Sequence, residues 1–128
     1  MTVRSTSTGT VLVKDIQSGS SGATPNYLTN VNGTLFFRAN DGTHGTELWK
    51  SDGTAAGTVL VKDIYPGADG SIPVGLVNVN GTLFFTAYDD INGRELWTSD
   101  GTEAGTVLVA DIYAGGGSSS PSNLTMVN

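Results

Sequence analysis

The stretch that decides the fold is Glu95–Ile112, ELWTSDGTEAGTVLVADI. It occurs a second time, almost unchanged, as Glu47–Ile64, and its tail occurs alone as Gly9–Ile16, GTVLVKDI. The spacing is 48 residues each time, and NVNGTLFF keeps the same spacing between Asn30 and Asn78. A constant spacing is typical of tandem repeats, in which similar units pack on their neighbours. The sequence therefore predicts one repeat domain over residues 1–128, made of repeat 1 (9–56), repeat 2 (57–104) and a partial repeat 3 (105–128).

Each complete repeat contains four predicted short strands, A to D in chain order. The first repeat has an Asn32-Gly33 dipeptide between its first two strands, which favours a two-residue type I′ hairpin turn. Asp52-Gly53-Thr54 is predicted to be a second turn, because a short Asp side chain bonds the backbone two residues on and Gly accepts a positive φ. The predicted strands are Leu28–Asn32, Thr34–Ala39, Thr46–Lys50 and Thr58–Ile64, then Leu76–Asn80, Thr82–Tyr88, Arg94–Thr98 and Thr106–Ile112.

The predicted fold class is all-β, built of β-propeller blades. Four antiparallel strands in a 48-residue repeat match a four-stranded blade meander. The apolar runs LFF and VLV require cover on both sheet faces, as in blades that pack face to face. A β-solenoid is the alternative fold.

The 128 residues predict an incomplete ring within one chain, with the strand order D-ABCD-ABCD-A. Propellers close with about 4–8 blades, so two blades and two loose strands leave apolar faces and strand edges open. We therefore expect homo-oligomerisation, in which copies of the chain complete one ring. The alternative is a fragment of a longer array, excised or engineered, with no ligand function of its own.

Both complete repeats match a known motif. Glu47–Thr54 and Glu95–Thr102 read ELWxxDGT, and the following GTxLVxDI continues the match. The chain resembles the bacterial ELWxxDGT, or hyalin-like, repeat family from about Gly9 to its end. Arg4-Ser5-Thr6 departs from the pattern where DGT would stand. The resemblance implies propeller-type repeats in secreted or cell-surface proteins, with an interaction or structural role and no implied reaction.

Composition excludes several classes of function. The net charge is −6 with only six basic residues, too few and too scattered to bind nucleic acid. The chain has no Cys and a single His, which excludes a zinc site. No apolar run reaches the roughly 20 residues that span a membrane, and residues 1–10 lack the apolar region of a signal peptide.

The aromatic residues recur at matching positions of the two repeats. Trp49 and Trp97 offer ring faces on which a sugar could stack, which is the lectin-like alternative, but repetition favours packing between blades. The predicted blade-packing residues are Trp49, Trp97, Phe36, Phe37, Phe84 and Phe85.

No cofactor and no catalysis are predicted, and calcium is the one metal considered. Ca²⁺ needs about 6–8 oxygen ligands with converging carboxylates, and DDINGRE falls short of the DxDxDG pattern. Catalysis is disfavoured because carboxylates repeated in every unit cannot all be acid–base pairs, and His44 is the only candidate base. The weak calcium candidates are Asp89, Asp90, Asn92 and Glu95.

Specific binding should reside where the repeats differ, on loops held by a rigid scaffold. The candidate ligand contacts are Tyr27, Arg38, Tyr65, Tyr88 and Arg94. The sequence thus predicts a non-enzymatic extracellular interaction or structural module whose partners are copies of itself, with carbohydrate or a surface protein as further candidates. A lectin-like module and an enzyme with a central-channel site are the alternatives.

Overall fold

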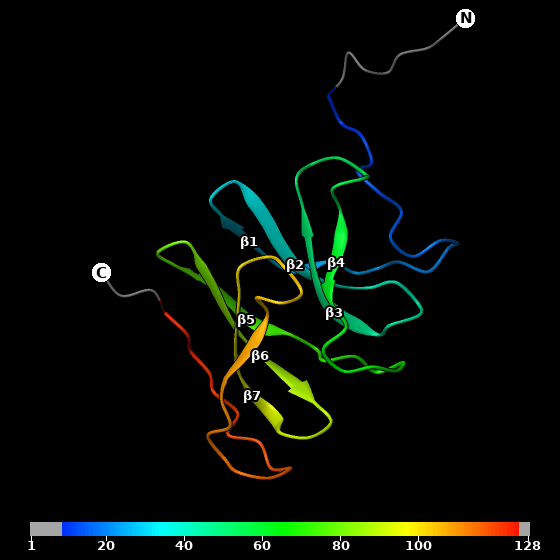
Figure 1. Ribbon diagram of the computed structural model, residues 1–128. Helices are drawn as coiled ribbons and strands as arrows, with labels where there is room; N and C mark the ends of the chain where they lie inside the picture. The colour runs from blue at the N-terminus through cyan, green and yellow to red at the C-terminus, as the bar shows by residue number, and fades with distance from the viewer. Residues whose placement is uncertain (1–8, 126–128) are drawn as a thin grey trace, which may run out of the picture.

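A computed structural model describes residues 9–125 of the chain (Figure 1). The fold is all-β, with eight strands arranged as two four-stranded antiparallel sheets in chain order. The described residues contain no helix long and apolar enough to cross a membrane. Sheet 1 consists of β1 (Asn26–Val31), β2 (Thr34–Asn40), β3 (Thr46–Ser51) and β4 (Val59–Lys62). Sheet 2 consists of β5 (Val74–Val79), β6 (Thr82–Asp89), β7 (Gly93–Ser99) and β8 (Val107–Ala110).

Each of the eight strands overlaps a predicted strand, although several begin or end one or two residues away from the predicted bounds, and the hairpin turns form as predicted. Asn32 and Gly33 have φ values of 52° and 88°, and Asn80 and Gly81 have 51° and 89°. Two positive φ values at the central positions define the type I′ turn, whose twist matches that of the flanking strands.

The DGT segments also form the expected turn. Asp52 Oδ1 accepts hydrogen bonds from Thr54 N (2.9 Å) and Thr54 Oγ1 (2.7 Å), while Gly53 has φ 94°. Asp100 binds Thr102 in the same way. These bonds lower the pKa of the exposed Asp52 carboxyl, the Thr54 hydroxyl contributing most.

The predicted strand order D-ABCD-ABCD-A is wrong at its first position. Residues 9–16 form no strand, because a strand is defined by its ladder in a sheet and neither four-stranded sheet includes this segment. The last predicted strand, 48 residues after Leu76–Asn80, falls on residues 124–128; Leu124 and Thr125 are not in a strand, and residues 126–128 lie outside the described part. The departure at Arg4-Ser5-Thr6 also lies outside it.

The two sheets meet in one apolar layer, which we call the joint. Sheet 1 and the residues after it contribute Phe36, Leu48, Val61 and Ile64, and sheet 2 contributes Leu83, Phe85, Ala87 and Trp97. Two hydrogen bonds between the sheets flank this layer. Lys50 Nζ donates to the Gly101 carbonyl (2.7 Å), and Lys62 Nζ donates to the Thr106 carbonyl (3.1 Å). Both lysines come from sheet 1 and both carbonyls from the sheet 2 side. Figure 1 shows the two sheets side by side.

The segment before sheet 1 contacts the opposite face of that sheet. Ile16 and Ala23 pack against Phe37, Ala39 and Trp49. Lys14 Nζ donates to the Thr58 carbonyl at 3.0 Å, and Asn40 N donates to the Ala23 carbonyl at 3.0 Å. Forty-eight residues on, Lys62 and Tyr88 make the matching bonds to Thr106 and Ser71. Residues 9–25 therefore lie on sheet 1 much as residues 57–73 lie on sheet 2.

Candidate functional site

Four of the five predicted ligand contacts gather around one link, residues 65–73 between the sheets. The Arg38 guanidinium lies over the Tyr27 ring, 5.0 Å from its centroid, and Arg94 lies over Tyr88 at 4.3 Å. Arg38 Nη1 donates to the Pro73 carbonyl (3.3 Å), and Arg94 Nη2 donates to the Ile72 carbonyl (2.8 Å). Two arginines from different sheets thus hold consecutive carbonyls of one link. We call Tyr27, Arg38, Tyr88 and Arg94 the Arg–Tyr cluster.

Local structure fixes each member of the cluster. Tyr27 sits in an irregularity of the β1–β2 ladder with φ 60°, where its N–H donates to Asn26 Oδ1 (2.8 Å). Arg94, the second residue of β7, pairs directly opposite Tyr88 of β6, and its Nη1 also donates to Thr86 Oγ1 at 2.8 Å. Paired residues of adjacent strands share one face, which brings the guanidinium over the tyrosine ring.

The link itself is held by β3. Thr46 O accepts a hydrogen bond from Ile72 N (3.0 Å), and Thr46 pairs with Gly70 in a parallel bridge. Ile72 has φ 49°, a left-handed conformation that is strained for a β-branched residue. The carbonyls that the arginines bind are therefore presented by an anchored backbone.

Tyr65, the fifth predicted contact, lies at the other end of the link. Its backbone N–H donates to Glu47 Oε1 at 2.9 Å. Within residues 9–125, no hydrogen bond, ion pair or ring contact joins it to the Arg–Tyr cluster.

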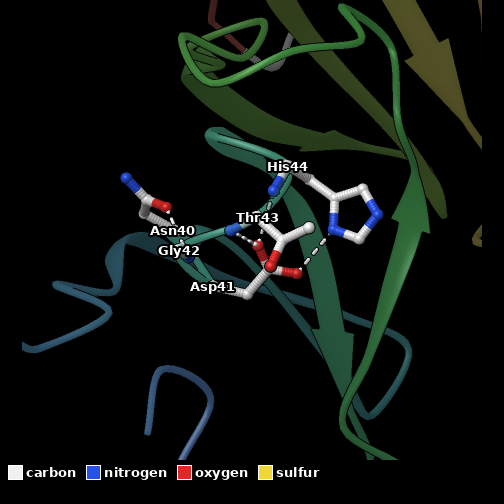
Figure 2. Close-up of polar contacts among 5 residues, drawn as sticks. All are labelled: Asn40, Asp41, Gly42, Thr43 and His44. Carbon is white, nitrogen blue, oxygen red and sulfur yellow. Dashed lines mark hydrogen bonds and ion pairs between the residues drawn. The ribbon is translucent and has the colours of Figure 1, made fainter. Parts of the chain in front are cut away.

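His44 lies in the β2–β3 loop and pairs with Asp41, as Figure 2 shows. His44 Nδ1 is 2.6 Å from Asp41 Oδ2, and Asp41 Oδ1 accepts the backbone N–H groups of Thr43 and His44. The hydrogen bond to Asp41 raises the pKa of His44. Burial pushes the Asp41 pKa upward, but the bonds from His44 and Thr43 outweigh it and lower that pKa. These bonds hold the β2–β3 loop together. Within the described residues, no nucleophilic side chain is hydrogen-bonded to the His44 imidazole.

The calcium candidates form the matching loop of sheet 2. Asp89 Oδ1 accepts the N–H groups of Ile91 and Asn92, and Asp89 Oδ2 accepts from Asn92 Nδ2 at 2.7 Å. Asn92 thus takes the place of His44. Asp90 is exposed on the same loop, whereas the Glu95 carboxylate is bonded elsewhere. No group of three or more His, Asp or Glu side chains positioned to hold a metal ion occurs in residues 9–125.

Glu47 and Glu95 are fully buried and anchor the segments that follow each sheet. Glu47 accepts hydrogen bonds from Ile64 N, Tyr65 N and Ser71 N (2.9–3.2 Å), and from Ser71 Oγ at 2.5 Å. Glu95 accepts the same set from Ile112 N, Tyr113 N, Ser119 N and Ser119 Oγ. Sequence reasoning missed this role, although the charged residue that directly precedes Leu-Trp in both ELW motifs was the available signal.

The two buried carboxylates differ in the direction of their pKa shifts. Burial, together with the neighbouring Asp63 carboxyl, raises the pKa of Glu47 to about 7 despite its hydrogen bonds. Asp63 Oδ1 is buried without a hydrogen-bond partner. Burial also pushes the pKa of Glu95 upward, but the bonds from Ser119, Tyr113 and Ile112 outweigh it, so that pKa lies below its ordinary value. Asp111, which corresponds to Asp63, is exposed.

The predicted blade-packing aromatics lie in or beside the apolar layers. Trp49 and Trp97 are each 6% exposed, and their indole N–H groups are buried without a partner. Neither ring face is open to a sugar. Phe36, Phe37 and Phe85 are buried, whereas Phe84 is half-buried and lines an open apolar groove on the free face of sheet 2.

Comparison with known proteins gives no match to a family model, a curated protein or a solved structure.

Proposed function

We propose that this chain is a non-enzymatic interaction and structural module of β-propeller type, whose sheets stack face to face as blades and whose free faces join copies of the chain. As the family resemblance implies, its setting is extracellular or the bacterial cell surface. The repeated carboxylates support a scaffold role, because Asp52, Asp100, Glu47 and Glu95 accept hydrogen bonds from the chain's own backbone.

One observation carries the proposal, namely the unequal exposure of corresponding residues on the two sheets. Val61 and Ile64 are each 6% exposed because the joint covers them. Their counterparts 48 residues on, Val109 and Ile112, are 47% and 61% exposed. The apolar surface that sheet 1 buries is thus partly open on sheet 2, where Val77, Val79, Phe84 and Leu96 line a groove that Leu124 and Thr125 border.

The free face of sheet 1 offers the complementary surface. An apolar groove there is lined by Leu12, Val13, Leu28 and Leu35, and all four side chains are exposed. In the joint, sheet 2 contributes the face that corresponds to this open face of sheet 1. It packs against the face of sheet 1 that corresponds to the open face of sheet 2. Repetition of the same contact between copies would cover both grooves. Contacts of this head-to-tail kind close into rings when the rotation per unit allows.

Light scattering on a size-exclusion column tests the proposal, with one discrete oligomer expected. Val109→Asp should break the oligomer because it puts a charge into the new contact. Val107→Asp is the matched control on the same strand, since its counterpart Val59 stays 36% exposed beside the joint. A wild-type mass of 13.2 kDa, or equal effects of the two variants, would overturn the proposal.

A further inference from the structure

The Arg–Tyr cluster concentrates positive charge on an acidic protein. The net charge is −6, yet two of the six basic residues donate hydrogen bonds to the same link between the sheets. The described lysines, Lys14, Lys50 and Lys62, each donate to a backbone carbonyl elsewhere. Arg38 and Arg94 are therefore the local source of positive charge at this end of the two sheets.

No carboxylate neutralises these arginines. Within residues 9–125 the only ion pair joins Asp41 and His44. Asp89 follows Tyr88 directly, but both of its oxygens accept hydrogen bonds from its own loop. The guanidinium bonds go to neutral acceptors, which are the Ile72 and Pro73 carbonyls and the Thr86 hydroxyl. Two half-buried cations without an anion leave a charge that an anionic ligand can neutralise.

The geometry of the arginines suits a carboxylate. Stacking on Tyr27 and Tyr88 and bonding to an anchored backbone fix the plane of each guanidinium. Arg38 uses one N–H group on the Pro73 carbonyl, which leaves most of its N–H groups for a ligand. A fixed guanidinium edge binds a carboxylate through two parallel hydrogen bonds, and pre-organisation reduces the ordering cost of binding.

Apolar surface lies beside the charges. Tyr27 is 41% exposed, Tyr88 38% and Ile72 37%. A ligand that satisfies both features carries carboxylates on rings with apolar faces. We propose that the Arg–Tyr cluster is a binding site for an acidic oligosaccharide, in which uronate carboxylates bind Arg38 and Arg94 while sugar rings contact the exposed tyrosines. This site does not depend on whether copies of the chain assemble.

The chain itself supplies matched replacements. Thr86 stands where Arg38 stands in the other repeat, and Thr46 stands where Arg94 stands. Arg38→Thr and Arg94→Thr are therefore substitutions that the repeated scaffold already accommodates. Lys14→Ala removes one positive charge elsewhere, copying the Ala110 of the third unit, and controls for net charge.

Isothermal titration of the full chain with tetragalacturonate, and with a neutral galactose tetramer, tests the proposal. We expect binding of the acidic tetramer only, weakened about tenfold by each arginine variant and unchanged by Lys14→Ala. Thermal melts establish that the variants fold. Absent binding, equal binding of the neutral tetramer, or unchanged affinity of Arg38→Thr and Arg94→Thr would overturn the site. Equally tight binding of a tetraglutamate peptide would overturn the saccharide as the ligand. Light scattering on the same samples reports assembly separately.

Discussion

The Lys62 ammonium donates a hydrogen bond to the Thr106 carbonyl oxygen at 3.1 Å, and so connects the last strand of sheet 1 to the turn that precedes the last strand of sheet 2. Lys14 makes the corresponding bond to Thr58 at 3.0 Å. Lysine stems cover apolar surface while the ammonium reaches a polar partner at the edge. Each contact between successive units therefore combines an apolar layer with a cationic donor at its border.

Lys62→Met tests the contribution of this donor, because methionine retains the apolar stem and removes the ammonium. We expect the free energy of unfolding to fall by about 1 kcal/mol, the usual net value of one hydrogen bond. Urea denaturation measures it. Lys14→Met should cost less, since Lys14 is exposed and holds only residues before sheet 1. Equal midpoints for wild type and Lys62→Met would contradict the assignment.

The raised Glu47 pKa predicts a pH-dependent stability. Below pH 4.5, the ordinary pKa of the group, the carboxyl is protonated in both the folded and unfolded states. Between pH 4.5 and about 7 the folded state keeps a proton that the unfolded state releases. Stability therefore falls as the pH rises through this window, by about 3 kcal/mol at most.

Asp63→Asn should weaken that dependence, because the Asp63 carboxyl adds to the burial that raises the pKa of Glu47. Asp111→Asn is the matched control at the exposed corresponding position and should leave the profile unchanged. Chemical denaturation from pH 4 to pH 8 gives the comparison. A profile of Asp63→Asn that follows the wild type would show that Asp63 does not raise the Glu47 pKa.

His44 is the single histidine, so its NMR titration is read without overlap. Its hydrogen bond to Asp41 predicts a pKa above the ordinary 6.5, and Asp41→Asn should lower that pKa. The pairing stabilises the fold below pH 6.5 and is lost as the pH rises through the raised pKa. The effect on stability should stay under about 1 kcal/mol because the pair is partly exposed. His44→Asn copies the sheet 2 loop and should preserve the fold.

Gly70 is predicted to tolerate no side chain. A Cβ there would lie 2.3 Å from both Thr46 N and Thr46 O, and φ is 77°. Gly70→Ala should therefore destabilise the protein by roughly 2 kcal/mol or more, combining clash with backbone strain. Gly67→Ala meets no atom within 4 Å, so it isolates the strain at positive φ. Thermal denaturation that ranked Gly67→Ala as the more damaging change would contradict this.

Local features were predictable from the sequence and tertiary ones were not. Asn32-Gly33 and the DGT turns depend on adjacent residues, and their geometry follows from φ preferences and short side chains. Residues 9–16 have the same sequence as residues 57–64, which contain β4, but form no strand, because strand formation depends on tertiary pairing as well as on the local residues.

The candidate site shows the same division. The positions at which the repeats differ identified Arg38 and Arg94, but not that both bind consecutive carbonyls of one link. The anchoring by Glu47 needed the path of the segment after β4, which returns to a buried carboxylate. Both relationships join residues more than fifteen positions apart.

The joint has unlike sides, since sheet 1 brings the lysine ammoniums and sheet 2 the carbonyls that accept them. A contact with unlike sides has a direction. A chain with a substitution on one free face would keep the other free face intact. It could bind to an assembly through the intact face, but the next copy could not bind to its altered face. A small fraction of Val109→Asp chain mixed with wild type should therefore inhibit assembly. The inhibition should increase with the number of copies in each assembly.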